Sequence, residues 1–338
     1  MPITDQRFEE VKAWLEGADA AFGLKVDTLA PASADASFRR YFRVEGAGGA
    51  AYIVMDAPPE KESVRPFVEV TALMHEAGLN APRILATDLQ KGFLLLTDLG
   101  RETYLDVLNE DNAARLMDDA TTALVAWQKI SRRGVLPEYD RAVLTREIEL
   151  FPEWYVKRHK GRVFTPDEEK WWAMTVDAVL ANNLAQERVF VHRDFMPRNL
   201  MLSEPNPGVL DYQDALYGPV SYDIASLLRD AFVSWNEAFV LDVTIRYWEK
   251  ARKAGIDVPG DFAQFYRDVE FMGVQRHLKV LGIFARIRYR DGKPKYLEDA
   301  PRFVNYLRQT SNRYLELSPL RRILTNLEGS DTVSGYTF

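Results

Sequence analysis

The chain has 338 residues, of which 47% are hydrophobic and 28% charged, an ordinary composition for a globular protein. It contains no cysteine, which excludes a disulfide framework, a thiol nucleophile and a cysteine-based metal site. The formal net charge of −7 argues against general nucleic-acid binding. The sequence shows neither a secretory leader nor an apolar run of membrane-spanning length, so we expect a cytoplasmic protein with no membrane partner.

The first hundred residues predict a helix followed by a sheet. Phe8, Val11, Trp14 and Leu15 fall on one face of a helix over residues 5–17, with Gly17 as its stop. Runs of alternating or continuous apolar residues predict five strands, at 25–30, 39–45, 50–56, 82–88 and 92–97, and a helix at 64–77.

The remainder of the chain reads mainly as helix. From Tyr104 onward apolar residues recur at three- and four-residue spacing, and the pattern predicts further helices at 145–157, 221–228, 265–290 and 300–315. We therefore predict an α+β protein with a small, mainly β lobe over residues 1–98 and a larger helical lobe over 99–338.

The most informative stretch lies between residues 189 and 214. His192, Arg193, Asp194 and Asn199 have the spacing H-R-D-x-x-x-x-N, which is that of the catalytic loop of kinases. Residues 200–202 and 209–210 read as a short hairpin around a Pro/Gly/Asn turn, which would bring Asp211 beside Asn199. The alternative is a turn whose Asp and Asn bond their own backbone, but such a turn does not require three polar side chains at these offsets.

These residue types suit phosphoryl transfer from ATP. Mg²⁺ prefers hard oxygen ligands and bridges the nucleotide phosphates, so Asn199 and Asp211 are the candidate metal ligands. Asp194, held off the metal, would accept the proton of the attacking hydroxyl and is the candidate catalytic base.

Two departures from protein kinases indicate a small-molecule substrate. Met196 stands where their catalytic loop usually has Lys, and Asp211 does not open a D-F-G. The predicted helix at 221–228 follows so soon that no activation segment fits, so the acceptor is expected to be a small hydroxylated molecule.

The segments H-R-D-F-M-P-R-N (192–199), L-D-Y-Q-D-A (210–215) and Y-D-I-A (222–225) resemble the aminoglycoside-phosphotransferase-like, or choline-kinase-like, family. Residues 37–44, 54–60 and 275–286 are similar to segments of its bacterial anomeric sugar kinases, which phosphorylate N-acetylmuramate and N-acetylglucosamine at C1 in peptidoglycan recycling. The resemblance covers nearly the whole chain and implies a bilobal protein-kinase-like fold, with ATP and Mg²⁺ as cofactors and an amino sugar as substrate.

The resemblance also implies supporting roles around the catalytic loop. Asp223 resembles the family Asp that hydrogen-bonds back to this loop, and His192 is expected to pack beneath the metal-binding Asp211. Asp214 would order the metal site or contact sugar hydroxyls.

The nucleotide-covering loop of kinases corresponds to residues 31–37. Ser33 and Ser37 are small hydroxyl residues that would let backbone N–H groups approach phosphate, although an ordinary hairpin turn explains them equally. Thr97, Asp98 and Leu99 form the expected interlobe hinge, whose backbone would bind adenine.

The third strand lacks the Lys with which kinases bind the nucleotide phosphates, since Met55 stands at that place. Arg43, or Arg40, would supply the missing charge, with Glu69 of the next helix as its partner. The competing reading is that the arginine forms a surface salt bridge and Glu69 is simply exposed.

Two predicted helices carry the candidate substrate contacts. Glu147 and Trp154 combine a carboxylate with an aromatic face, as sugar sites often do, but a helix packed by its aromatics accounts for them too. Arg276 and His277 lie on a partly buried basic helix, where Arg276 would bind the lactyl carboxylate of a muramate; solvated helix charge is the alternative.

Two rival functions stay open. A kinase of the same fold acting on an aminoglycoside or choline would have an acid-lined pocket for its cationic substrate. A nucleotide-binding pseudokinase that serves as a scaffold is supported only by Met55.

Overall fold

The structure is a computed structural model that describes residues 6–32 and 38–329. It divides into two compact units, one formed by Met1–Leu108 with Arg198–Asp214 and the other by Asn109–Pro197 with Ala215–Phe338. The division of the chain into lobes at residues 1–98 and 99–338 stays a prediction.

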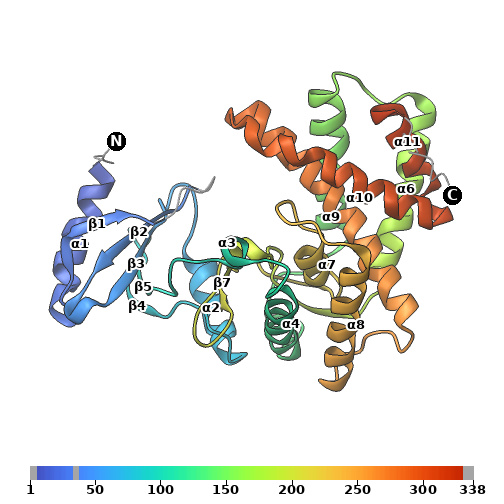
Figure 1. The fold of residues 1–338 in the computed structure, drawn as a ribbon. Coiled ribbons are helices and arrows are strands. Elements are labelled where there is room, and N and C mark those ends of the chain that lie inside the picture. The colour runs from blue at the N-terminus through green and yellow to red at the C-terminus, as the bar shows by residue number, and fades with distance from the viewer. Residues whose placement is uncertain (1–5, 33–37, 330–338) are drawn as a thin grey trace. The chain divides into compact units, whose positions relative to one another are not determined.

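The first unit is built on a five-stranded antiparallel sheet of order β1-β2-β3-β5-β4, with a separate two-stranded hairpin, β7-β8 (Figure 1). Its elements are α1 (Gln6–Phe22), β1 (Lys25–Pro31), β2 (Arg40–Glu45), η1 (Ala47–Gly49), β3 (Ala51–Asp56), α2 (Arg65–Glu76), β4 (Ile84–Asp88), β5 (Phe93–Thr97), α3 (Tyr104–Val107), β7 (Leu200–Met201) and β8 (Gly208–Val209). The five predicted strands of the sheet and the helix at 64–77 are confirmed to within two residues at each end.

Helix α1 covers one face of this sheet. Its apolar stripe joins a buried cluster with alternate residues of the strands, namely Phe8, Val11, Leu15, Phe42, Val44, Val54, Phe93 and Leu95. The predicted stop at Gly17 is wrong, because the helix continues to Phe22, whose ring packs on Tyr52. A glycine inside a helix costs only about 1 kcal/mol relative to alanine. The helix ends instead before Gly23, whose φ of 59° suits glycine.

The β7-β8 hairpin holds the two candidate metal ligands at its base. Leu200 pairs with Val209 and Met201 with Gly208, close to the predicted register. The Leu210 N–H donates to the Asn199 carbonyl at 2.9 Å, so the two strands are still joined where the polar residues begin. The predicted hairpin is confirmed.

The second unit is mainly helical, as predicted. Its elements are α4 (Ala113–Lys129), α5 (Arg141–Ile148), a π-helix η2 (Phe151–His159), α6 (Pro166–Leu184), β6 (Arg188–Val191), β9 (Leu216–Pro219), α7 (Tyr222–Leu228), α8 (Glu237–Lys253), α9 (Phe262–Asp291), η4 (Pro294–Asp299), α10 (Ala300–Arg313), η5 (Leu315–Leu317) and α11 (Ser318–Glu328); η3 (Pro197–Asn199) lies where the chain passes between the units.

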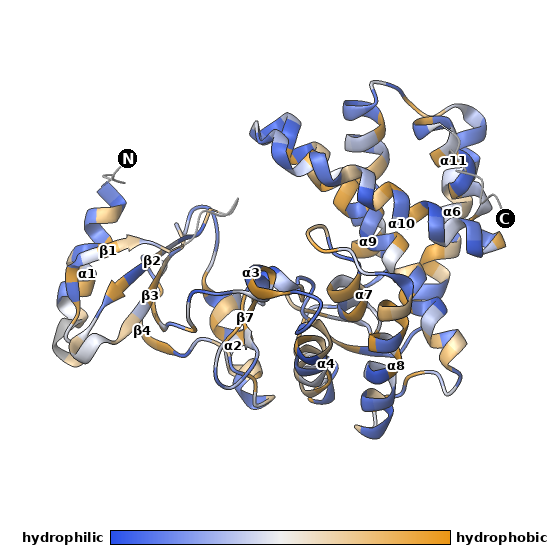
Figure 2. Ribbon diagram, in the orientation of Figure 1, coloured by the Kyte–Doolittle hydropathy of each residue, from blue (hydrophilic) through white to orange (hydrophobic). Residues whose placement is uncertain are grey.

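The 30-residue helix α9 forms the centre of this unit. Its buried residues Phe271, Leu278 and Leu281 join one apolar cluster with residues of η2, α6, α10 and α11. Figure 2 shows hydrophobic and hydrophilic residues alternating along α10, as expected for a helix with one face on this core. No helix within residues 6–32 and 38–329 is both long and apolar enough to cross a membrane.

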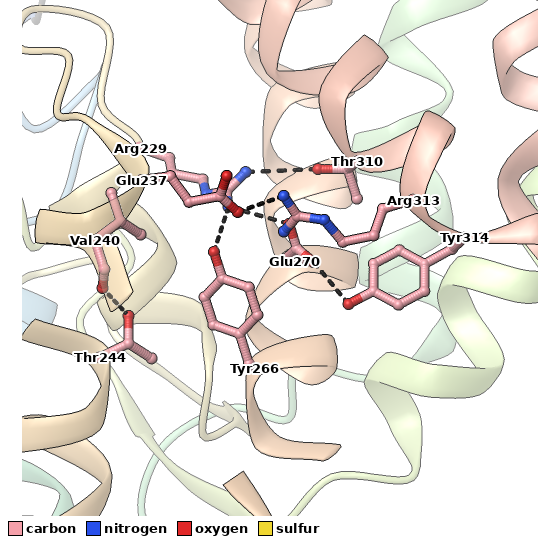
Figure 3. Close-up of polar contacts among 9 residues, drawn as sticks. All are labelled: Arg229, Glu237, Val240, Thr244, Tyr266, Glu270, Thr310, Arg313 and Tyr314. Atoms are coloured by element: carbon pink, nitrogen blue, oxygen red, sulfur yellow. Dashed lines mark hydrogen bonds and ion pairs between the residues drawn. The ribbon is translucent and has the colours of Figure 1, made fainter. Parts of the chain in front are cut away.

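A buried ionic network fastens the end of α7 to α9 and α10 (Figure 3). The Glu270 carboxylate accepts hydrogen bonds from Arg229 at 3.2 Å, Arg313 at 2.7 Å and the Tyr314 hydroxyl at 2.6 Å. Arg229 also donates to the Tyr266 hydroxyl at 3.2 Å. Glu270 and Arg229 are both buried, so removing Glu270 would leave the charge of Arg229 buried without its carboxylate partner.

Candidate active site

The predicted catalytic loop starts in the second unit, directly after β6. Arg193 has φ 79°, a left-handed conformation that is strained for a residue with a side chain. Asp223, at the start of α7, holds this loop from below: its Oδ2 accepts the His192 N–H at 2.7 Å and its Oδ1 the Arg193 N–H at 2.9 Å. These two bonds favour the supporting role expected for Asp223.

Burial raises the pKa of Asp223 to about 7, against the lowering effect of the two N–H groups it accepts. His192 is fully buried, and its Nδ1 lies 3.3 Å from the Asp194 backbone nitrogen, which donates to it. Its ring meets Phe195 edge-on, so His192 also supports the loop.

Glu147 of α5 is buried at the centre of a charge cluster beside the loop. Its Oε1 lies 2.5 Å from Arg193 Nη2 and 2.9 Å from Lys279 Nζ, and its Oε2 accepts the Tyr139 hydroxyl. Lys279 further donates to the Tyr222 hydroxyl at 3.2 Å. The carboxylate predicted to bind sugar is therefore occupied by two cations of its own unit.

The electrostatics of this cluster involve Asp194. Burial alone would raise the pKa of Glu147, but Lys279 and Arg193 together lower it. Burial would lower the pKa of Lys279, yet Tyr222, Glu147 and Asp194 raise it. Both cations thus interact with the Asp194 carboxylate as well as with Glu147. The cluster therefore contains two carboxylates, Glu147 and Asp194, and two cationic side chains, Arg193 and Lys279.

The candidate metal ligands come together in the first unit. Asn199 Nδ2 lies 3.4 Å from Asp211 Oδ2, and Gln213 Nε2 donates to Asp211 Oδ1 at 2.9 Å and to Asp214 Oδ2 at 3.5 Å. Asp211 and Asp214 are exposed, and Asp211 has φ 63°. A strained, exposed carboxylate beside an amide is a donor set that fits Mg²⁺.

Among the residues that the structure describes, no group of three or more His, Cys, Asp or Glu side chains could hold a metal ion. A pair of protein ligands is enough for Mg²⁺ in a kinase, because that ion keeps waters and takes phosphate oxygens for its other positions.

Tyr212 anchors residues 211–214, the segment with the candidate metal ligand Asp211 (the metal-ligand segment), to α2. Its ring stacks on Phe67 with centroids 5.0 Å apart, and its buried hydroxyl lies 2.8 Å from Thr71 Oγ1. The residue after Asp211 is therefore held inside the first unit while Asp211 itself stays exposed.

The predicted nucleotide residues are dispersed over the first unit. Arg43 binds both carboxylate oxygens of Asp98, at 2.5 and 3.0 Å, and the Gly100 carbonyl at 2.7 Å. The Thr97 hydroxyl accepts the Arg83 N–H at 2.9 Å, and Leu99 is half-buried. Ser33 and Ser37 lie outside the described residues.

Glu69 is exposed on α2 and forms no ion pair with any described residue. The acid paired with an arginine in this region is Glu62, which precedes α2 and binds Arg39. Arg39 is only 7% exposed. Neither residue was identified from the sequence, where nothing distinguishes Arg39 from Arg40 or Glu62 from other acids.

The remaining predicted substrate residues belong to the second unit. Trp154 is half-buried against the apolar core. Arg276 is 4% exposed and interacts with the buried Asp223. His277 is buried, stacks on Tyr306 with centroids 5.0 Å apart, and donates its Nε2–H to the Arg229 carbonyl at 3.3 Å. Burial lowers its pKa well below the ordinary value, so it is neutral.

Each unit thus holds half of the predicted set: Asp194 with Asp223 and the Glu147 cluster, and Asn199 with Asp211 and Asp214. Four residues of sequence separate Asp194 from Asn199. Lys279 and Tyr139 were missed as neighbours of the loop: Lys279 is far from Glu147 in sequence, and no local pattern pairs Tyr139 with Glu147.

A profile of the phosphotransferase enzyme family (APH) matches residues 28–258. The chain is 54% identical to the N-acetylmuramate/N-acetylglucosamine kinase of Pseudomonas aeruginosa, covering 96% of this chain and 97% of that protein. It is 51% identical to the protein of the same name from Neisseria meningitidis serogroup B, covering 98% of this chain and 100% of the relative.

Among solved structures, a crystal structure of choline kinase from Cryptosporidium parvum Iowa II has the same fold, with a TM-score of 0.60 and 14% identity, covering 94% of this chain and 99% of that one. The predicted kinase-like fold and the resemblance stated above are confirmed. The length of the matched region and the identity to full-length relatives show that the chain belongs to the phosphotransferase enzyme family.

Proposed function

We propose that this protein is an ATP-dependent kinase that phosphorylates the anomeric, C1 hydroxyl of N-acetylmuramate and N-acetylglucosamine. The observation that carries this proposal is the 50–54% identity, over nearly the whole chain, to three proteins named N-acetylmuramate/N-acetylglucosamine kinase. The reaction takes place in the cytoplasm, where ATP is made, and serves the recycling of peptidoglycan sugars.

The residues of the catalytic loop and hairpin have distinct roles in this reaction. Asn199 and Asp211 hold Mg²⁺, with Gln213 orienting the Asp211 carboxylate. Mg²⁺ held by these residues would supply positive charge for the nucleotide phosphates. Asp194 accepts the proton of the sugar hydroxyl and orients that oxygen toward the phosphorus.

The anomeric hydroxyl makes a modest demand on the base. It is more acidic than an ordinary alcohol, so alignment and electrostatics supply most of the rate enhancement. Asp223 and the Glu147 cluster contribute to alignment, because they hold the strained loop on which Asp194 sits.

A substrate panel tests this proposal. ADP release is measured with Mg²⁺ATP and each of N-acetylmuramate, N-acetylglucosamine, choline and an aminoglycoside, and the phosphorylated position is assigned by ³¹P–¹H NMR. We expect turnover with the two amino sugars and a phosphate on C1. Turnover confined to choline or the aminoglycoside would replace the substrate assignment, and a phosphate on any other hydroxyl would refute the C1 assignment.

A further inference from the structure

The third strand of the sheet, β3, provides no cation for the nucleotide phosphates. Kinases use a Lys on this strand, paired with an acid of the following helix, to hold the phosphates. Here Met55 takes that place and is fully buried. A kinase still needs positive charge near the transferred group, since ATP carries several negative charges.

The pairing of β2 with β3 shows which arginines share a face with Met55. Met55 lies directly opposite Tyr41, and residues opposite each other in an antiparallel pair project to the same face. Phe42 and Val44 project to the other face, into the cluster under α1. By the same alternation Arg40 projects to the face of Phe42 and Val44. There its guanidinium and that of Arg7 both bind the buried Asp56 carboxylate.

Arg43 is on the same face as Tyr41 by this alternation, but its guanidinium is engaged. Asp98 binds it at two nitrogens, and the Gly100 carbonyl takes a further hydrogen bond. This arrangement ties β2 to the segment after β5.

Arg39 is the remaining arginine of this segment. It forms an ion pair with Glu62 and a hydrogen bond with the Tyr41 hydroxyl, and so lies beside the residue that faces Met55. Glu62 is a partly buried acid just before α2. An acid near α2 and a cation near β3 are the two components that the Lys–acid pair of kinases provides.

The neighbours of this pair include the metal-ligand segment. Burial is the main cause that raises the pKa of Tyr41, and the Asp211 carboxylate adds to the rise. Burial also raises the pKa of Glu62, and Asp214 adds to that. Asp211 and Asp214 therefore lie within electrostatic range of the Tyr41 and Glu62 side chains, inside the same compact unit.

We propose that Arg39, oriented by Glu62, is the residue that binds the nucleotide phosphates in place of the missing third-strand lysine. The assignment rests on the proposed kinase function and names one residue of its nucleotide site. A guanidinium suits this role because its fork matches phosphate oxygens and it stays charged when buried.

Nucleotide binding, measured by calorimetry on the full chain without sugar, tests the assignment. Relative to wild type, we expect Arg39→Met to weaken MgATP binding about 10- to 100-fold while the affinity for adenosine, which has no phosphate, changes less than about twofold. Glu62→Gln should weaken MgATP binding about three- to tenfold, because Arg39 loses its orienting partner. Arg39→Lys, which keeps the charge but loses the fork, should bind MgATP with an affinity between those of Arg39→Met and wild type.

Arg65→Met is the matched control, since Arg65 is an exposed arginine at the start of α2. It should bind both ligands as wild type does. Equal MgATP affinity in Arg39→Met and Arg65→Met would overturn the assignment. If Arg39→Met does not fold, Glu62→Gln decides: an MgATP affinity equal to that of Arg65→Met would overturn the assignment as well. A wild-type protein that binds no MgATP would instead refute the kinase function.

Discussion

Arg193 and Glu147 form an ion pair of 2.5 Å that joins the strained catalytic loop to helix α5. Lys279 binds the same carboxylate oxygen at 2.9 Å. Since Asp194 also interacts with both cations, the four groups form one balanced set of charges. Glu147 is therefore expected to act on catalysis by positioning the loop, without contact to the sugar.

Glu147→Gln leaves this set with one excess positive charge. We expect it to lower kcat about 10- to 100-fold, with a smaller change in KM for the sugar, because a buried cation is left uncompensated. Glu149→Gln is the control, since Glu149 of the same segment accepts a hydrogen bond from Trp172 outside the cluster. It should keep kcat within about threefold of wild type.

The double variant Glu147→Gln, Lys279→Met restores the balance of charge. Its kcat should recover to within about fivefold of wild type, although Lys279→Met alone is impaired. If the two losses simply multiply in the double variant, charge balance is not the reason for the effect of Glu147.

Tyr212 links the metal-ligand segment to α2, and its two contacts are separable by mutation. Tyr212→Phe keeps the stack on Phe67 and loses only the bond to Thr71, which should lower the free energy of unfolding by about 1 kcal/mol. Tyr212→Ala removes the ring as well and should cost about 3–5 kcal/mol. It should also raise the Mg²⁺ concentration for half-maximal activity, because Asp211 is no longer held in its strained conformation. An unchanged melting temperature and Mg²⁺ dependence in Tyr212→Ala would contradict this linkage.

Asp223 gives the enzyme a pH dependence whose direction follows from its pKa of about 7. The ionised carboxylate accepts both loop N–H groups, whereas the protonated form loses one acceptor. We expect kcat to rise between pH 6 and 8. The contribution of Asp223 to stability has the opposite trend: since its folded pKa is raised, that contribution is present below about pH 4 and is lost as the pH rises through 7.

Asp223→Asn tests this assignment through pH profiles of kcat and of the melting temperature. The variant should be slower, and its residual kcat should be nearly flat between pH 6 and 8. A rise in kcat as steep as that of wild type would show that another group titrates.

Glu168 stabilises the second unit at the start of α6. It accepts hydrogen bonds from the Thr165 N–H at 2.9 Å, from Asn326 at 3.0 Å and from Arg162. Burial alone would raise its pKa, but these bonds lower it to about 2. The contribution of Glu168 to the free energy of unfolding is therefore present above about pH 4.5 and is lost as the pH falls through 2.

We expect Glu168→Gln to lower the free energy of unfolding by about 2–3 kcal/mol at pH 7 and by progressively less in acid. Glu169→Gln, at the exposed neighbour, is the control and should change it by less than about 0.5 kcal/mol. A difference between Glu168→Gln and wild type that does not shrink toward pH 3 would contradict the assignment.

Much of the fold could be predicted because its signals are local. Alternating or continuous apolar runs predict the strands of the sheet, and a Pro/Gly/Asn turn between Leu200 and Val209 predicts the hairpin. The Asn199–Asp211 contact follows from that hairpin alone. The predicted end of α1 was wrong. The choice between Gly17 and Gly23 depends on the contact of Phe22 with Tyr52, a residue 30 positions later in the sequence.

The charged residues could not be assigned from local patterns. Arg39, Arg40 and Arg43 are close in sequence, yet strand alternation and distant carboxylates give each a different partner. The ion pairs of Glu147 with Arg193 and Lys279 could not be predicted, because these cations come from segments that only the tertiary fold brings to it. Pairing of this kind depends on long-range packing, which a single sequence does not display.

The most direct measurement is sugar-dependent ADP release by wild type and Asp194→Asn at saturating Mg²⁺ATP and N-acetylmuramate. We predict that wild type turns over only when both Mg²⁺ and the sugar are present, and that Asp194→Asn loses about 10²–10⁴-fold in kcat while it still binds MgATP. Equal turnover in the two proteins, or none in wild type, would contradict the central claim that Asp194 serves phosphoryl transfer to this sugar.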